Sequence, residues 1–161
     1  MWSTILTGIS LAGSGVQAGA LLMFLFGICP TFRSVDVPDW MRIHTSMDRS
    51  IERYMPVLNV VTGGTTLILL FLPQDGVVRL LRVAALICNV ALALISELAN
   101  VRLNKVIARK SLVLVGAGGS SASDETQRMA EIRDRWIAWH WVRTLVITTG
   151  FLLYIVAAIL R

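Results

Sequence analysis

Four long apolar runs restrict what this chain can fold into more than any other feature. They cover about residues 4–29, 56–72, 80–101 and 139–160. A bilayer core about 30 Å thick is crossed by roughly 20 helical residues, so the first and last runs span it, and the middle two do so when their flanks stay helical. With 55% hydrophobic and only 16% charged residues, the composition is also that of a membrane protein. We therefore predict an all-α membrane protein whose residues 1–161 form one domain, a bundle of four transmembrane helices.

Basic residues are distributed unevenly between the segments that join these runs. Four arginines lie in residues 30–55 and seven lysines and arginines in residues 102–138, whereas the opposite side of the bundle holds Arg79, Arg82 and Arg161. The positive-inside rule places both basic loops in the cytoplasm and both termini outside the cell membrane. Orientation in the lipid bilayer then explains the net charge of +5, and we do not expect nucleic-acid binding.

The second helix is predicted to begin well before its apolar part. Helix-start signals occur at Asp36 and Asp39, and no helix breaker follows before Pro56. We expect a cytoplasmic extension of the second helix that kinks at Pro56. Its arginines share one face of this extension, whereas His44 and Asp48 lie on the other face and are expected to point into the bundle.

Residues 115–123, with the sequence VGAGGSSAS, are predicted to form a Gly/Ser-rich loop between the third and fourth helices. An amphipathic segment follows it from Asp124 into the fourth span. Since this loop has no strand before it and no Lys-Ser/Thr pair after it, it does not match a phosphate-binding loop.

Small and polar residues form stripes on the first two spans. Such stripes are best explained by close helix packing, and they are also compatible with a homo-oligomer. The members are Ser10, Gly13, Ser14, Gln17, Asn59, Thr62, Gly63 and Thr66.

Polar side chains also gather where the spans reach the predicted cytoplasmic side. There are three such groups of side chains, each on one helix. At 100° per residue, the members of a group share one face of their helix, and the alternating direction of the helices brings the three groups to one end of the bundle. Ionisable groups inside a membrane bundle are costly unless paired or solvated, so they indicate function. In the alternative interpretation they only fasten the helices together, with Arg143 paired to Glu97 or Asp48. The groups are His44 with Asp48, Glu97 with Asn100 and Asn104, and Trp136 with His140 and Arg143.

The motifs on these helices resemble those of the anthrone-oxygenase-like family of small integral membrane proteins. They are an AG pair at Ala18, an N-x-x-x-N motif from Asn100 to Asn104, and a W-x-x-x-H-x-x-R motif from Trp136 to Arg143. This chain reads NVRLN where the family usually has proline in the asparagine motif, which adds the cation of Arg102 at the pocket mouth. The resemblance implies that O2 oxidises an anthrone, an apolar aromatic polyketide of secondary metabolism, to a quinone without a flavin or a metal.

This chemistry needs a base, a stabilised carbanion or phenolate, and a water-poor pocket. His140 is the first candidate base, with Asp48 or Glu97 orienting it. The other candidates would bind the substrate, either as hydrogen-bond donors to the developing oxyanion or as aromatic surfaces for its rings. These are Arg143, Asn100, Asn104, His44, Trp136 and Trp139.

Two further interpretations stay open. A metal-dependent oxidase could bind iron, copper or zinc with the N/O ligand set His44, Asp48, Glu97 and His140, although the chain lacks a Glu-x-x-His motif. Alternatively, the protein is a non-enzymatic membrane scaffold or partner subunit whose polar cluster only fixes helix packing.

Overall fold

The computed structural model describes residues 1–51, 53–113 and 120–161 of the chain. Within these ranges the regular structure is helical and contains no strand, which confirms the all-α class. The elements are α1 (Trp2–Met23), the π-helical turn η1 (Phe24–Ile28), α2 (Cys29–Ser34), α3 (Val37–Ile51), α4 (Met55–Leu70), α5 (Gly76–Ile95), the π-helical turn η2 (Ser96–Asn100), α6 (Val101–Val113) and α7 (Ser120–Ile159).

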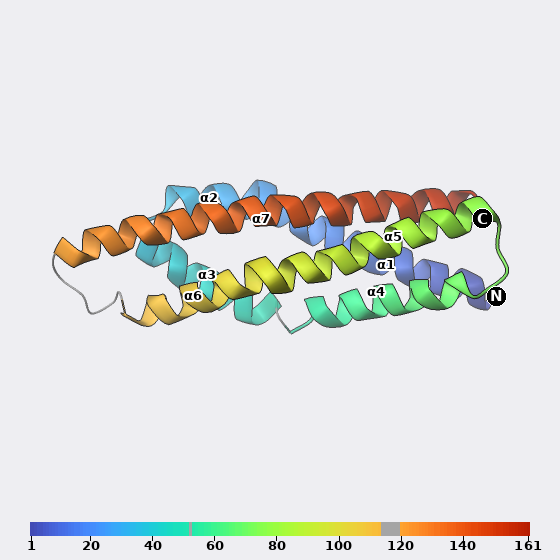
Figure 1. Ribbon diagram of the computed structural model, residues 1–161, viewed down its shortest axis with the longest axis horizontal. Helices are drawn as coiled ribbons and strands as arrows, with labels where there is room; N and C mark the ends of the chain where they lie inside the picture. Colours follow the sequence, from blue (N-terminus) through green and yellow to red (C-terminus); the bar gives the residue numbers. More distant parts are fainter. Residues whose placement is uncertain (52, 114–119) are drawn as a thin grey trace.

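The helices form one elongated bundle along which α7 runs from end to end (Figure 1). Helix α5 packs along α7, while α1 packs against both α4 and α7, and α3 packs against α6. Three helical stretches are long and apolar enough to cross a membrane, namely Trp2–Ser34, Gly76–Ser111 and Ser123–Ile159, and Met55–Leu70 is a shorter apolar helix. By length and hydrophobicity, these helices are those of a membrane protein. Both termini lie at the same end of the bundle (Figure 1).

The expected extension of the second helix is present, but it is a separate helix. Arg53 and Tyr54 form a turn, and α4 then begins at Met55 with Pro56 in its first turn. A proline fits there because the first turn of a helix leaves its N–H groups unbonded, whereas inside a helix it removes a hydrogen bond. The expectation of one continuous helix kinked at Pro56 is therefore wrong.

The faces of α3 are as expected from the sequence. Trp40, Met41 and His44 are buried, while Arg42 and Arg49 are exposed. The predicted Gly/Ser-rich loop at 115–123 lies mostly outside the described residues, which resume at Ser120 with the start of α7.

Close approaches between helices explain the stripes of small residues. A Cβ atom added at Gly13 would collide with Oγ1 of Thr62, and one added at Gly63 would lie 2.7 Å from Oδ1 of Asn89. Helix α1 therefore touches α4 at one glycine, and α4 touches α5 at the other. This confirms the interpretation of both stripes as packing surfaces.

Two π-helical turns interrupt the long helices near the middle of the bundle. In η1 the N–H of Cys29 bonds to the carbonyl of Phe24, and in η2 the N–H of Val101 bonds to that of Ser96. The cause at η1 is local, since Pro30 has no N–H to continue the α-helical pattern. A π-turn holds one extra residue, so side chains beyond it point about one residue position away from where α-helical spacing would put them.

Candidate active site

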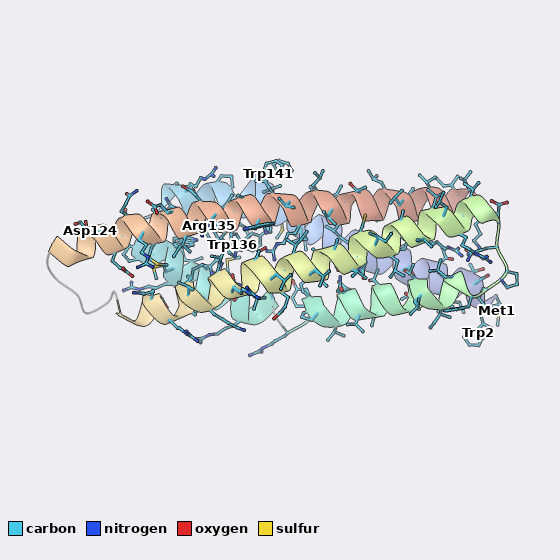
Figure 2. All side chains as sticks on the ribbon, viewed as in Figure 1. Met1, Trp2, Asp124, Arg135, Trp136 and Trp141 are labelled. Carbon is cyan, nitrogen blue, oxygen red and sulfur yellow. The ribbon has the colours of Figure 1, made fainter. Side chains whose placement is uncertain are left out.

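Trp136 is the centre of a buried aromatic and polar cluster. Its side chain points from α7 toward the interior of the bundle (Figure 2) and is 3% exposed. The ring of His140 stacks on it, with ring centres 5.2 Å apart and an interplanar angle of 16°. The ring of His44, from α3, meets the same indole edge-on, with ring centres 4.8 Å apart and an angle of 86°. The structure thus brings together two of the histidines and one of the tryptophans that the sequence proposed.

A short chain of hydrogen bonds joins Trp136 to a carboxylate. The indole Nε1 donates to Oδ1 of Asn104 over 2.7 Å, and Nδ2 of Asn104 donates to Oδ1 of Asp48 over 2.7 Å. Asn100 makes a longer contact, 3.4 Å from its Nδ2 to the carbonyl of Trp136. Asn104, the second asparagine of the N-x-x-x-N motif, therefore fixes the position of the indole, and Asp48 orients Asn104 and not a histidine.

Both ring nitrogens of His140 are engaged by the protein. Nδ1 accepts from Nε of Arg143 at 3.1 Å and lies 2.7 Å from Nη2 of the same side chain. Because Nδ1 accepts, Nε2 carries the proton, and it faces the carbonyl oxygen of Leu21 at 3.2 Å. His140 is thus held as one neutral tautomer between α1 and Arg143, and it takes up a proton only if a bond to Arg143 is broken.

His44 has the opposite environment. It is 2% exposed, and neither of its ring nitrogens has a hydrogen-bond partner in the part of the chain that the structure describes. Burial, and to a smaller extent the positive charge of Arg143, lower the pKa of His44 to about 4, so its ring is neutral at physiological pH. Buried polar atoms normally have partners. Two unpartnered nitrogens on one side chain therefore mark a place for a ligand or a water molecule.

Two further buried atoms beside His44 and Trp136 also lack hydrogen-bond partners among the described residues. They are Nε1 of Trp40, whose ring centre lies 5.8 Å from that of His44, and Oδ1 of Asn100, whose amide nitrogen contacts Trp136. Together with the nitrogens of His44 they provide donors and acceptors around one indole.

Arg143 places a positive charge against this cluster. Its guanidinium carbon lies 5.5 Å from the ring centre of Trp136, within the range of a cation–π contact. Its Nε and Nη2 atoms are used by His140, whereas Nη1 makes no hydrogen bond with the described residues. Arg143 therefore hydrogen-bonds to His140 and interacts electrostatically with Asp48, one of the two partners that the packing interpretation proposed, while its Nη1 group is left for a ligand.

Two aromatic residues of the cluster were not predicted. Phe24 contacts the rings of His140 and Trp136, at 5.2 and 5.8 Å between ring centres, and Phe32 contacts those of His44 and Trp136, at 5.9 and 6.2 Å. In an ideal α-helix these two phenylalanines, eight residues apart, would point about 80° apart. The π-turn η1 lies between them and changes that relation, so helical spacing alone gave no signal for the pair.

Two candidate residues lie outside the cluster. Glu97 is exposed, although Asn100 and Asn104 on its expected stripe are buried. The stripe assumed α-helical spacing, which η2 interrupts between Glu97 and Asn104. Trp139 is 40% exposed because it precedes His140 by one residue and so points about 100° away around the helix. The predicted inward positions of these two side chains are corrected accordingly.

The proposed metal ligands are not assembled. Within the described ranges, no group of three or more His, Cys, Asp and Glu side chains is arranged to hold a metal ion. Of the set His44, Asp48, Glu97 and His140, the two histidines contact one indole, the aspartate bonds to Asn104, and the glutamate is exposed. These positions do not fit the ligand set that the metal hypothesis requires.

Comparison with known families gives one match. The family model described as anthrone oxygenase matches residues 43–153, which is most of the chain and includes the polar part of the cluster: His44, Asp48, Asn100, Asn104, Trp136, His140 and Arg143. No curated protein matches the chain, and no solved structure matches it either. The matched region confirms the resemblance drawn from the helix motifs: the chain belongs to the anthrone oxygenase family.

Proposed function

We propose that the protein is a membrane-embedded oxygenase that oxidises an anthrone, or a similar phenolic aromatic polyketide of secondary metabolism, with O2. The observation that carries the proposal is the environment of His44, a buried neutral imidazole with two unpartnered nitrogens beside Trp136. Membership of the anthrone oxygenase family supports the reaction class. The apolar surroundings suit both a ring substrate and O2, which is itself apolar.

The reaction converts a ring methylene and O2 into a carbonyl group and water. In the first step the unprotonated nitrogen of His44 takes one C–H proton, and the electron pair left on carbon is delocalised onto the substrate's carbonyl oxygen. That oxygen becomes negative. Nη1 of Arg143, the nitrogen that His140 leaves unused, donates to it and stabilises the charge in a medium of low dielectric constant.

In the second step the carbanion gives its electrons to O2. A C–O bond forms, and the proton held by His44 completes a substrate hydroperoxide. His44 then removes the second C–H proton, the O–O bond breaks, the carbonyl forms, and the departing hydroxide takes up the proton as water. Both C–H hydrogens leave with one oxygen atom, so the substrate supplies all the electrons and we propose that no flavin or metal takes part.

This assignment gives the two histidines different roles. The sequence made His140 the first candidate base, but its nitrogens bond to Arg143 and face Leu21. We assign the base role to His44, and to His140 the positioning of Arg143. Asp48 and Asn104 position Trp136, beside whose indole the substrate ring would lie, and the unpartnered Oδ1 of Asn100 would contact the substrate.

Oxygen consumption by protein in lipid nanodiscs with emodin anthrone tests the proposal. We expect the wild-type protein to consume oxygen faster than the spontaneous reaction, and a chelator to leave this uptake unchanged. The uptake should fall at least about 100-fold in His44→Gln. It should persist in Trp139→Phe, because the ring of Trp139 lies outside the cluster. Uptake that is lost on chelation would replace the metal-free mechanism by a metal-dependent one. A wild-type rate no greater than that of empty nanodiscs would refute the proposed activity.

A further inference from the structure

A groove of about 380 Å³ lies between the end of the first helical run and α7. This volume is in the range of small-molecule sites. Its wall is apolar apart from one arginine and one thiol. The lining residues are Leu25, Phe26, Cys29, Pro30, Arg33, Ile137 and Trp141.

Two exposed aromatic rings form the rim of the groove. Phe26 and Trp141 are 64% and 51% exposed, and their rings meet edge to face with centres 5.6 Å apart. Trp141 points away from the bundle interior, in contrast to Trp136 (Figure 2). The pair therefore presents aromatic surface to whatever occupies the groove.

Arg33 supplies the charge at this rim. Its Nε lies 3.3 Å from Oδ1 of Asp134, and both side chains are 58% exposed. A surface pair of this kind contributes little to stability and is easily exchanged for another partner. Nη1 and Nη2 of Arg33 make no hydrogen bond to the described residues. These two nitrogens have the spacing that receives both oxygens of a carboxylate.

The floor of the groove adjoins the candidate active site. Leu25, Cys29 and Ile137 are buried, and they belong to the same hydrophobic cluster as Trp136. Leu25 directly follows Phe24 in the chain, and Ile137 directly follows Trp136. The groove and part of the cluster are thus built from neighbouring residues of η1, α2 and α7, one set lining the groove and the other buried in the bundle.

We propose that this groove binds an anionic aromatic molecule, with its rings against Phe26 and Trp141 and its acidic group on Arg33, and that it is the docking site of the substrate. The substrate then carries a carboxylate in addition to its phenolic rings. The identification of this ligand with the substrate rests on the proposed function, whereas the binding site itself does not. An apolar acid dissolved in the bilayer would reach the groove laterally, through the exposed rims of α2 and α7.

Binding is tested with an anthraquinone carboxylate and with uncharged anthraquinone, titrated calorimetrically into full-length protein in phosphatidylcholine nanodiscs and corrected for empty nanodiscs. Arg33→Gln is compared with Arg42→Gln, because Arg42 forms a similar exposed pair with Asp39, at 3.5 Å, and does not line the groove. We expect Arg33→Gln to weaken carboxylate binding about tenfold or more and to leave anthraquinone binding unchanged, while Arg42→Gln affects neither. Trp141→Ala should weaken binding of both ligands, unlike Trp139→Ala.

Equal effects of the two arginine substitutions would overturn the proposal. Displacement of the carboxylate by a few mole per cent of phosphatidylglycerol would also overturn it, because the groove would then be an anionic lipid site. Oxygen uptake separates this inference from the proposed function. Selective carboxylate binding without oxidation of any anthrone would support the ligand site and refute the activity. Oxidation of an anthrone carboxylate with a KM that Arg33→Gln leaves unchanged would refute only the docking role.

Discussion

Replacing Asn104 by Leu should destabilise the fold and show that the amide is a structural link. The substitution leaves Nε1 of Trp136 buried without an acceptor, which costs about 1–3 kcal/mol, and removes the 2.7 Å hydrogen bond to Asp48. A hydrogen bond to a charged group contributes about 1.5–3 kcal/mol, and the half-buried position of Asp48 favours the lower end of that range. Added together, these terms give an expected loss of about 2.5–4.5 kcal/mol in the free energy of unfolding.

The matched control is Asn100→Leu, the same substitution one turn earlier. Asn100 is fully buried, makes only a 3.4 Å contact, and has an unpartnered Oδ1 atom within the described residues, so leucine removes a buried polar group at little cost. Stability is measured by reversible unfolding in mixed micelles, and activity by oxygen uptake. We expect Asn100→Leu to unfold within about 1 kcal/mol of wild type while losing activity. Equal stability losses in the two variants would refute the distinction between a structural and a ligand-facing asparagine.

Three further predictions concern His44, the packing of α5 on α7, and Trp136. The value of kcat/KM should fall with decreasing pH only near pH 4, because the base must be unprotonated and burial lowers the pKa of His44 to about 4. A fall near pH 6.5, the ordinary pKa of histidine, would show that the ring is solvated. Gly150→Ala should lower the midpoint of thermal unfolding, because the added Cβ would lie 2.9 Å from Cβ of Cys88 where α5 packs on α7. Gly19→Ala is the control and should not lower it, because no atom lies within 4 Å of the added Cβ. Equal midpoints in the two variants would contradict this packing. Trp136→Phe should retain a stacked ring but lose the bond to Asn104 and leave a cavity where the larger indole packed, so it should lower the free energy of unfolding, and unchanged stability would contradict the contacts described for Trp136.

Some of this architecture follows directly from residue patterns. The apolar runs predict helices because only residue hydrophobicity and length are involved, and the two faces of α3 follow from the spacing of its arginines. The approach of His44, Trp136 and His140 was predictable from the alternating direction of the helices. Packing at Gly13 and Gly63 was predictable from residue size.

The remaining features depend on contacts between segments that are distant in sequence. The position of Glu97 was predicted wrongly because the π-turn η2 changes the helical spacing at this point. No proline or other local feature of the sequence predicts that turn. The roles of the two histidines depend on which ring nitrogens are occupied, and this is decided by the carbonyl of Leu21 and the side-chain conformation of Arg143. Residue type and spacing alone do not carry that information.

The central claim is that His44, and not His140, removes the proton from the substrate. The most direct measurement is deuterium exchange into the ring methylene of emodin anthrone in D2O without oxygen, which isolates proton removal from the reaction with O2. We predict exchange above the buffer rate in wild type, a reduction of at least about 100-fold in His44→Gln, and a smaller loss in His140→Gln that comes from the displaced Arg143. Exchange that survives in His44→Gln but disappears in His140→Gln would contradict the account.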